Sequence, residues 1–136
     1  MTVKTSWYGE ELVAKMNTAT ARAVISVGEH IAVETKRVTH VMSGNLRRSV
    51  HTAPKDYDGS GDEGAAGSGD MMMAGSVNEA SIQTSEGPML EVGSWLPYAC
   101  AEWVGRGHPG IEQGVEMVRG ERIQAIFAQS FTEAGL

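Results

Sequence analysis

The side chains best suited to chemistry are the histidines, the single cysteine and several glutamates. The four histidines are His30, His40, His51 and His108, and they are scattered along the chain. A metal centre needs three or four ligands that converge on one point. We therefore expect no metal site, and we interpret Glu112, Glu116 and Glu121 as one solvated helix face.

The remaining candidates for catalysis also lack partners in the sequence. Cys100 is the one cysteine, which excludes an internal disulfide and a cysteine-based zinc site. It lies in the apolar stretch 98–101, so we predict a buried, unreactive thiol. Ser43 and Ser49 have no nucleophile-elbow context, and the glycine loop at 105–107 is too short to hold a phosphate. We expect no catalytic residue, no cofactor and no enzymatic activity.

Two adjacent arginines, Arg47 and Arg48, are the most conspicuous charged pair. If residues 46–53 form a strand, these side chains point to opposite faces. One of them could then pair with a carboxylate such as Glu102, while the other reaches solvent, a second subunit or a phosphate. Two arginines in an acidic protein form a poor phosphate-binding footprint. We therefore favour ion pairing within or between chains.

Tryptophan and methionine mark candidate contact surfaces. Trp7 and Trp103 lie at the ends of predicted elements, where an interface could accept the indole N–H; an ordinary core position is the alternative for Trp103. Met71, Met72 and Met73 lie inside a glycine- and aspartate-rich segment. Three flexible apolar side chains there suit docking onto a partner, or they are simply tolerated in solvent.

Length and charge limit the class of protein. The 136 residues suit one domain, and the formal charge of −6 argues against a protein that coats nucleic acid. We expect no signal peptide, and no apolar run approaches the roughly 18–20 residues of a membrane span. In residues 54–79, Lys55 stands against six carboxylates, including Asp56, Asp58, Asp62 and Glu63.

Hydrophobic periodicity predicts an α+β fold, with a long N-terminal helix and a C-terminal helix packed on a small antiparallel sheet. A helix of about 36 residues would be about 54 Å long, more than one small core covers. We therefore expect a break near Gly28 or packing on another chain. The expected elements are a long helix at 7–42, strands at 46–53, 77–84 and 89–94, a flexible loop at 55–76, a short helix at 97–104 and a C-terminal helix at 111–131.

Three short motifs share one order and spacing. The first, Ser43-Gly44-Asn45-Leu46-Arg47-Arg48-Ser49-Val50, follows the long helix. The second is Val92-Gly93-Ser94 followed by residues 97–105, and the third is the His108-Pro109 start of the last helix. Together they resemble the HK97 gp10-like family of tailed-phage neck and tail-completion (head–tail connector) proteins. Gly110 and Gly114 depart from that pattern, which often has a large apolar residue and alanine there.

The resemblance implies a virion structural protein at the head–tail junction, with no cofactor or catalysis. Such proteins form a sixfold or twelvefold ring around the DNA channel and contact head-closure and tail-terminator proteins. An acidic channel wall lets DNA slide without capture, which suggests a channel-facing role for Asp56, Asp58, Asp62 and Glu63. The alternatives are another virion role, as tail terminator, head-closure or minor capsid protein, and a small nucleic-acid-binding regulatory domain.

Overall fold

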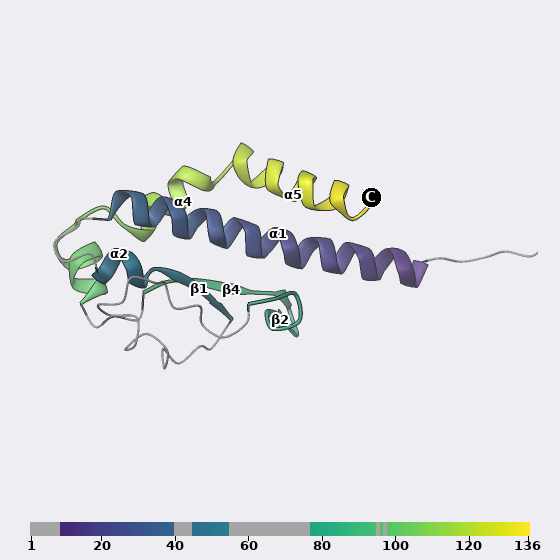
Figure 1. The fold of residues 1–136 in the computed structure, drawn as a ribbon, viewed down its shortest axis with the longest axis horizontal. Coiled ribbons are helices and arrows are strands. Elements are labelled where there is room, and N and C mark those ends of the chain that lie inside the picture. The colour runs from purple at the N-terminus through teal and green to yellow at the C-terminus, as the bar shows by residue number, and fades with distance from the viewer. Residues whose placement is uncertain (1–8, 40–44, 55–76, 95, 97) are drawn as a thin grey trace, which may run out of the picture.

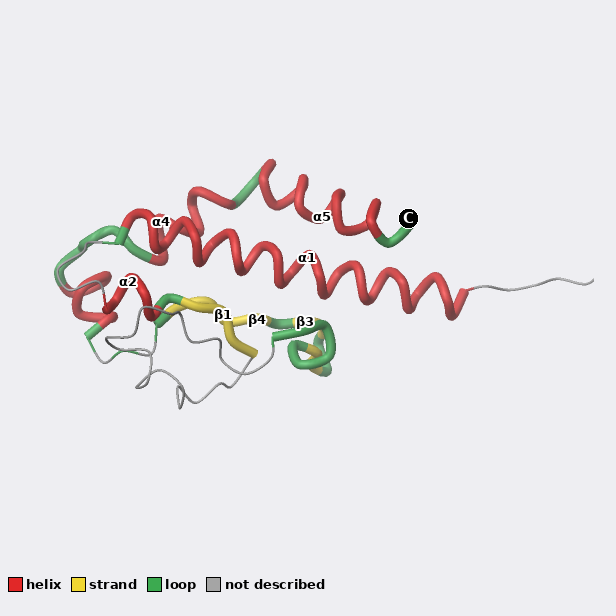
Figure 2. The backbone as a smooth tube through the Cα atoms, in the orientation of Figure 1, coloured by secondary structure: helices red, strands yellow, loops and turns green. Residues whose placement is uncertain are grey.

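The computed structural model describes residues 9–39, 45–54, 77–94, 96 and 98–136. One helix, α1 (Gly9–Val38), runs along the molecule, and the other elements lie against its two sides (Figure 1). Helices α4 (Ile111–Val118) and α5 (Glu121–Glu133) cover one side. Strands β1 (His51–Pro54) and β4 (Leu90–Gly93) cover the other (Figure 2). The predicted α+β class is confirmed.

Helix α1 is continuous, so the predicted break near Gly28 is wrong. Its charges suit the helix dipole, with Glu10 and Glu11 in the first turn and Lys36 in the last. Gly28 is buried, and a Cβ there would collide with the Leu90 side chain. The glycine therefore allows a close approach of a neighbouring element, which is β4.

The first predicted strand, 46–53, is wrong over its first half. Residues Asn45–Ser49 form a short helix, α2, and the strand β1 begins only at His51. The Ser49 hydroxyl donates to the Leu46 carbonyl oxygen at 2.7 Å, which caps this single turn. Leu46 is buried, so tertiary contact outweighs the alternation that favoured a strand.

The sheet is smaller than predicted. β1 pairs antiparallel with β4, with His51 opposite Gly93 and Pro54 opposite Leu90. The predicted strand 77–84 is mostly turn, because the Asn78 side-chain oxygen accepts hydrogen bonds from the Ala80 and Ser81 amides. Only β2 (Gln83–Thr84) is extended, and it pairs with β3 (Gly87–Pro88). The predicted strand 89–94 corresponds to β4.

The two predicted C-terminal helices also change. The short helix expected at 97–104 is a π-helix at Ala101–Gly105, preceded by a helical Ala99 and Cys100. The helix expected at 111–131 is divided into α4 and α5 at Gly120, whose φ is +87°. Only glycine adopts that backbone conformation without strain.

The described core consists largely of small side chains. Half of its buried apolar residues are alanines, and three of them, Ala19, Ala21 and Ala23, lie in the middle of α1 with no exposed surface. The larger members include Ile82, Val118 and Ile126. A core of alanines brings backbones together, but each alanine removes little apolar area from water.

Candidate functional site

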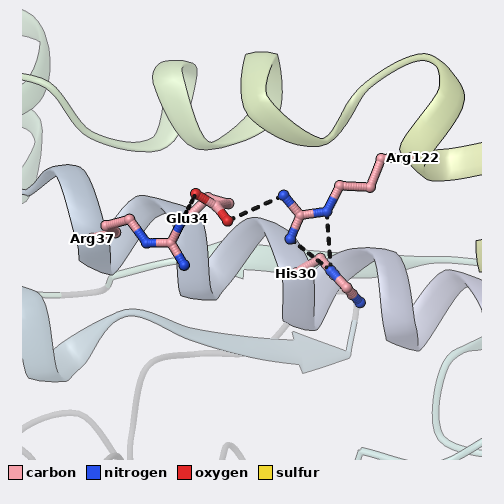
Figure 3. A network of polar contacts seen from close by, with 4 residues as sticks. All are labelled: His30, Glu34, Arg37 and Arg122. Atoms are coloured by element: carbon pink, nitrogen blue, oxygen red, sulfur yellow. Dashed lines mark hydrogen bonds and ion pairs between the residues drawn. The ribbon is translucent and has the colours of Figure 1, made fainter.

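A polar network joins α1 to α5 between the two helices (Figure 3). Glu34 is only 2% exposed and accepts hydrogen bonds from two arginines, Arg122 at 3.1 Å and Arg37 at 3.1 Å. Arg122 also donates to Nδ1 of His30, through its NH2 group at 2.8 Å and its Nε at 3.3 Å. A guanidinium can only donate, so Nδ1 of His30 is the acceptor in both of these contacts.

The network carries one surplus positive charge, because two guanidiniums share a single buried carboxylate. It positions α5 on α1 by charge-assisted hydrogen bonds. The sequence prediction missed this network. The available signal was His30 and Glu34 at i, i+4, on the flank of the apolar stripe that includes Val27 and Ile31.

A second contact, between α4 and α1, depends on Gly114. A Cβ at Gly114 would collide with Oγ1 of Thr35 and would lie 3.0 Å from the Ile31 carbonyl oxygen. Thr35 is fully buried, and its hydroxyl has no hydrogen-bond partner among the described residues. This departure from the family pattern therefore allows α4 to approach the α1 backbone.

The segment 102–110 includes the end of the second motif and the beginning of the third. The Glu102 carboxylate accepts a hydrogen bond from Arg106 at 2.7 Å, and its other oxygen lies 3.8 Å from Nε2 of His108. A Cβ at Gly110 would collide with the Trp103 indole. Trp103 is thus half-buried against Gly110, and a larger residue at position 110 would force the indole to move.

Arg47 and Arg48 lie on the helix α2, not on opposite faces of a strand. Arg47 is exposed and Arg48 is half-buried. Burial lowers the pKa of Lys36 in the last turn of α1, and the Arg47 guanidinium lowers that pKa further.

The remaining proposed contact and channel residues lie outside the described residues. They are Trp7, Met71, Met72, Met73, Asp56, Asp58, Asp62 and Glu63. Their proposed roles stay predictions.

The first turns of α1 form an exposed surface that sequence analysis did not single out as a site. Every residue from 10 to 18, which we call the arm, is exposed. Leu12, Val13 and Met16 of the arm are 48%, 55% and 43% exposed. Helix α1 continues past the end of α5 here (Figure 1). The predicted surplus of helix length is therefore visible at the N-terminal end.

An apolar groove of about 270 Å³ lies farther along the same helix, where α1, β4 and α5 meet. Its walls include Val24, Val27, Ile31, Leu90, Ile123 and Phe127. Every one of these six side chains is only partly buried. The groove lacks the convergent polar groups that orient a small substrate. Its chemistry fits an apolar side chain of a macromolecule.

The other chemical predictions have mixed outcomes. Cys100 is exposed, so the predicted buried thiol is wrong; helix geometry turns it outward while Ala99 faces the core. Glu112, Glu116 and Glu121 are exposed, as predicted. Within the described ranges, histidine, cysteine and acidic side chains form no metal-binding cluster. A search of the same residues found no helix long and apolar enough to span a membrane.

Comparisons with protein-family models, with curated proteins and with solved structures found no match to this chain.

Proposed function

We propose that this chain is a structural subunit of a tailed-phage virion, one copy of a ring at the head–tail junction through which DNA passes. The observation that carries this proposal is the exposed arm. Leu12, Val13 and Met16 form an apolar strip on a helix end that the described elements do not cover. Such a strip on a small protein marks a surface that a partner covers.

The order of the three sequence motifs supports the same role. The described part of the first motif covers α2 and leads to β1, and the second motif begins on β4, the partner strand of β1. The third begins α4, which packs on α1. The motifs thus lie at connections that hold the long helix against the sheet and the C-terminal helices. That distribution suits a family resemblance that extends through the fold.

The charge pattern supports passive contact with DNA over specific binding. The guanidiniums of Arg22, Arg37 and Arg106 each pair with a carboxylate. Paired arginines neutralise few phosphates, so a role as a nucleic-acid-binding regulator is less well supported. The acidic residues Asp56, Asp58, Asp62 and Glu63 remain our candidates for the channel-facing segment.

The test is to count this chain in purified particles by quantitative mass spectrometry, relative to the portal protein. We expect one or two small rings of copies, with the ratio to portal deciding between sixfold and twelvefold order. Hundreds of copies would indicate a tube or capsid component instead. Absence from particles would contradict the proposal, and salt-dependent binding to duplex DNA would then favour the regulatory role.

A further inference from the structure

The arm and the groove have matching chemistry on one continuous helix. The arm presents Leu12, Val13 and Met16 to solvent, and the groove is walled by apolar side chains that remain partly exposed. A helix that places apolar side chains one turn apart is the usual occupant of such a groove. The arm therefore presents an apolar helix face, and the groove presents an apolar site of the kind that binds such a face.

The two surfaces cannot meet within one chain. Val13 of the arm and Ile31 of the groove are 18 residues apart, which is about five full turns, so they point to the same side of α1. Helix α1 is unbroken from Gly9 to Val38 and cannot fold back on itself. If an arm occupies the groove, it must therefore be the arm of another molecule.

The arm is acidic, and a partly exposed guanidinium lies next to the groove in the chain. The arm carries Glu10 and Glu11 against Lys15, which leaves one negative charge. Beside the groove, Arg122 and Arg37 share the single carboxylate of Glu34, which leaves one positive charge. Arg122 precedes the groove residue Ile123, and its side chain is 36% exposed. An approaching arm therefore meets a cation at the rim of an apolar site.

We propose that the arm of one copy docks its apolar face into the groove of a second copy, with its acidic residues towards Arg122. This contact rests on the proposed function for its closure into a ring. Because the two surfaces differ, the contact is heterologous, and an open complex keeps one free groove at one end and one free arm at the other. Repetition of the contact then forms a ring where the rotation closes.

Two single variants test the contact in the purified full-length chain. Met16→Lys places a cation on the apolar face of the arm, and Val24→Arg fills the groove with a charged side chain. Each should raise the dissociation constant for self-association at least about tenfold, measured by sedimentation. Thr18→Lys and Val33→Arg are matched controls, since both positions are exposed and lie on other sides of α1. These controls should associate like the unmodified chain.

Mixing the two variants distinguishes this contact from the alternatives. A Met16→Lys chain keeps its groove and a Val24→Arg chain keeps its arm, so an equal mixture should form one-to-one dimers and nothing larger. If Val24→Arg alone still self-associates, the arms pair with each other and the proposal is wrong. Absence of dimers in the mixture, or of any association by the unmodified chain, also overturns it.

Disulfide trapping gives a measurement that does not depend on lost stability. Val13→Cys and Val27→Cys, each with Cys100→Ser to remove the exposed thiol, should form a mixed disulfide when combined. A disulfide between two Val13→Cys chains in preference to the mixed one would contradict the proposal. If the mixed disulfide forms but the chain is absent from virions, only the proposed function is refuted. If the chain is present in virions but the mixed disulfide does not form, only this contact is refuted.

Discussion

Single glycines decide how closely the elements approach α1. At Gly114 and Gly110 the missing Cβ makes room for Thr35 and for the Trp103 indole. Glycine in a helix ordinarily costs about 1 kcal/mol relative to alanine, so α4 gives up helix propensity at Gly114. The close contact with α1 is what offsets that cost.

Gly114→Ala should therefore destabilise the protein, although alanine is the better helix former. We expect a loss of roughly 1–3 kcal/mol in the free energy of unfolding, because the added methyl meets Thr35 and the α1 backbone. Thr35→Ala in the same chain should recover part of the loss. Gly105→Ala, which adds a methyl group in open space, is the control and should change stability little. Urea denaturation of the unmodified chain and of the three variants measures these free energies of unfolding. Equal effects of Gly114→Ala and Gly105→Ala would contradict this account.

Glu34 is the residue on which the polar network depends. Replacing it with glutamine leaves two guanidiniums around an uncharged amide in a buried position. We expect Glu34→Gln to cost roughly 1–3 kcal/mol of unfolding free energy, since both arginines remain partly solvated. Glu116→Gln removes an exposed pair with Arg119 and should cost less than about 0.5 kcal/mol. Similar costs for the two variants in thermal denaturation would argue against the network's role.

At the scale of elements, the short strands and turns pack against the long helix α1. The turn that carries Glu79 is joined to α1 by an ion pair, in which Arg22 Nε donates to the Glu79 carboxylate at 2.8 Å. That hydrogen bond from Arg22 holds the pKa of Glu79 below its ordinary value. The attachment of the turn therefore depends on pH.

Acidification should loosen this turn before the rest of the fold. Because the folded pKa of Glu79 is lowered, its stabilising contribution is present above the unfolded value, about 4.3, and is lost as pH falls through the folded value. The protection factors of the amides at 80–84, which correct for the intrinsic slowing of exchange in acid, should fall over that range. Arg22→Gln should weaken this pH dependence, because it removes the largest cause of the lowered pKa of Glu79, whereas Lys15→Gln should leave the dependence unchanged. Unchanged acid sensitivity in Arg22→Gln would contradict the assignment to this pair.

At the scale of the whole molecule, packing is concentrated in one part of α1. Apart from Gly9, the buried residues of α1 extend from Ala19 to Thr35, whereas residues 10–18 are all exposed. An uncovered helix end has few contacts to resist local opening. In the proposed contact, a second copy supplies part of the free energy that orders the arm.

Hydrogen exchange of free and associated chain checks this distribution. In the free chain, amides at 12–18 should exchange much faster than those at 23–35. Association should slow the exchange of amides at 12–18. The amides at 23–35 should exchange at nearly the same rates as in the free chain. Slow exchange of the arm in a chain shown to be monomeric would mean that the arm is already covered within the molecule.

The amino-acid sequence by itself determined the features that depend on local pattern. The three- and four-residue spacing of apolar side chains identified the long helix, and the charges at its ends suit its direction. The antiparallel strand at 90–93 and the exposed glutamates of the C-terminal helices also follow from local pattern. The excess helix length was predicted from the limited area that one small core can cover.

Tertiary structure decided the features that depend on residues far apart in sequence. The turn at Asn45–Ser49 is helical because Leu46 is buried and Ser49 caps the turn, and alternation alone could not show either contact. The glycines at 110 and 114 are explained only by Trp103 and Thr35, which other elements supply. Arg122 is separated from His30 and Glu34 by about ninety residues, so only the packing of α5 on α1 brings the network together. Periodicity describes a face, and the identity of what meets that face depends on how the chain folds back on itself.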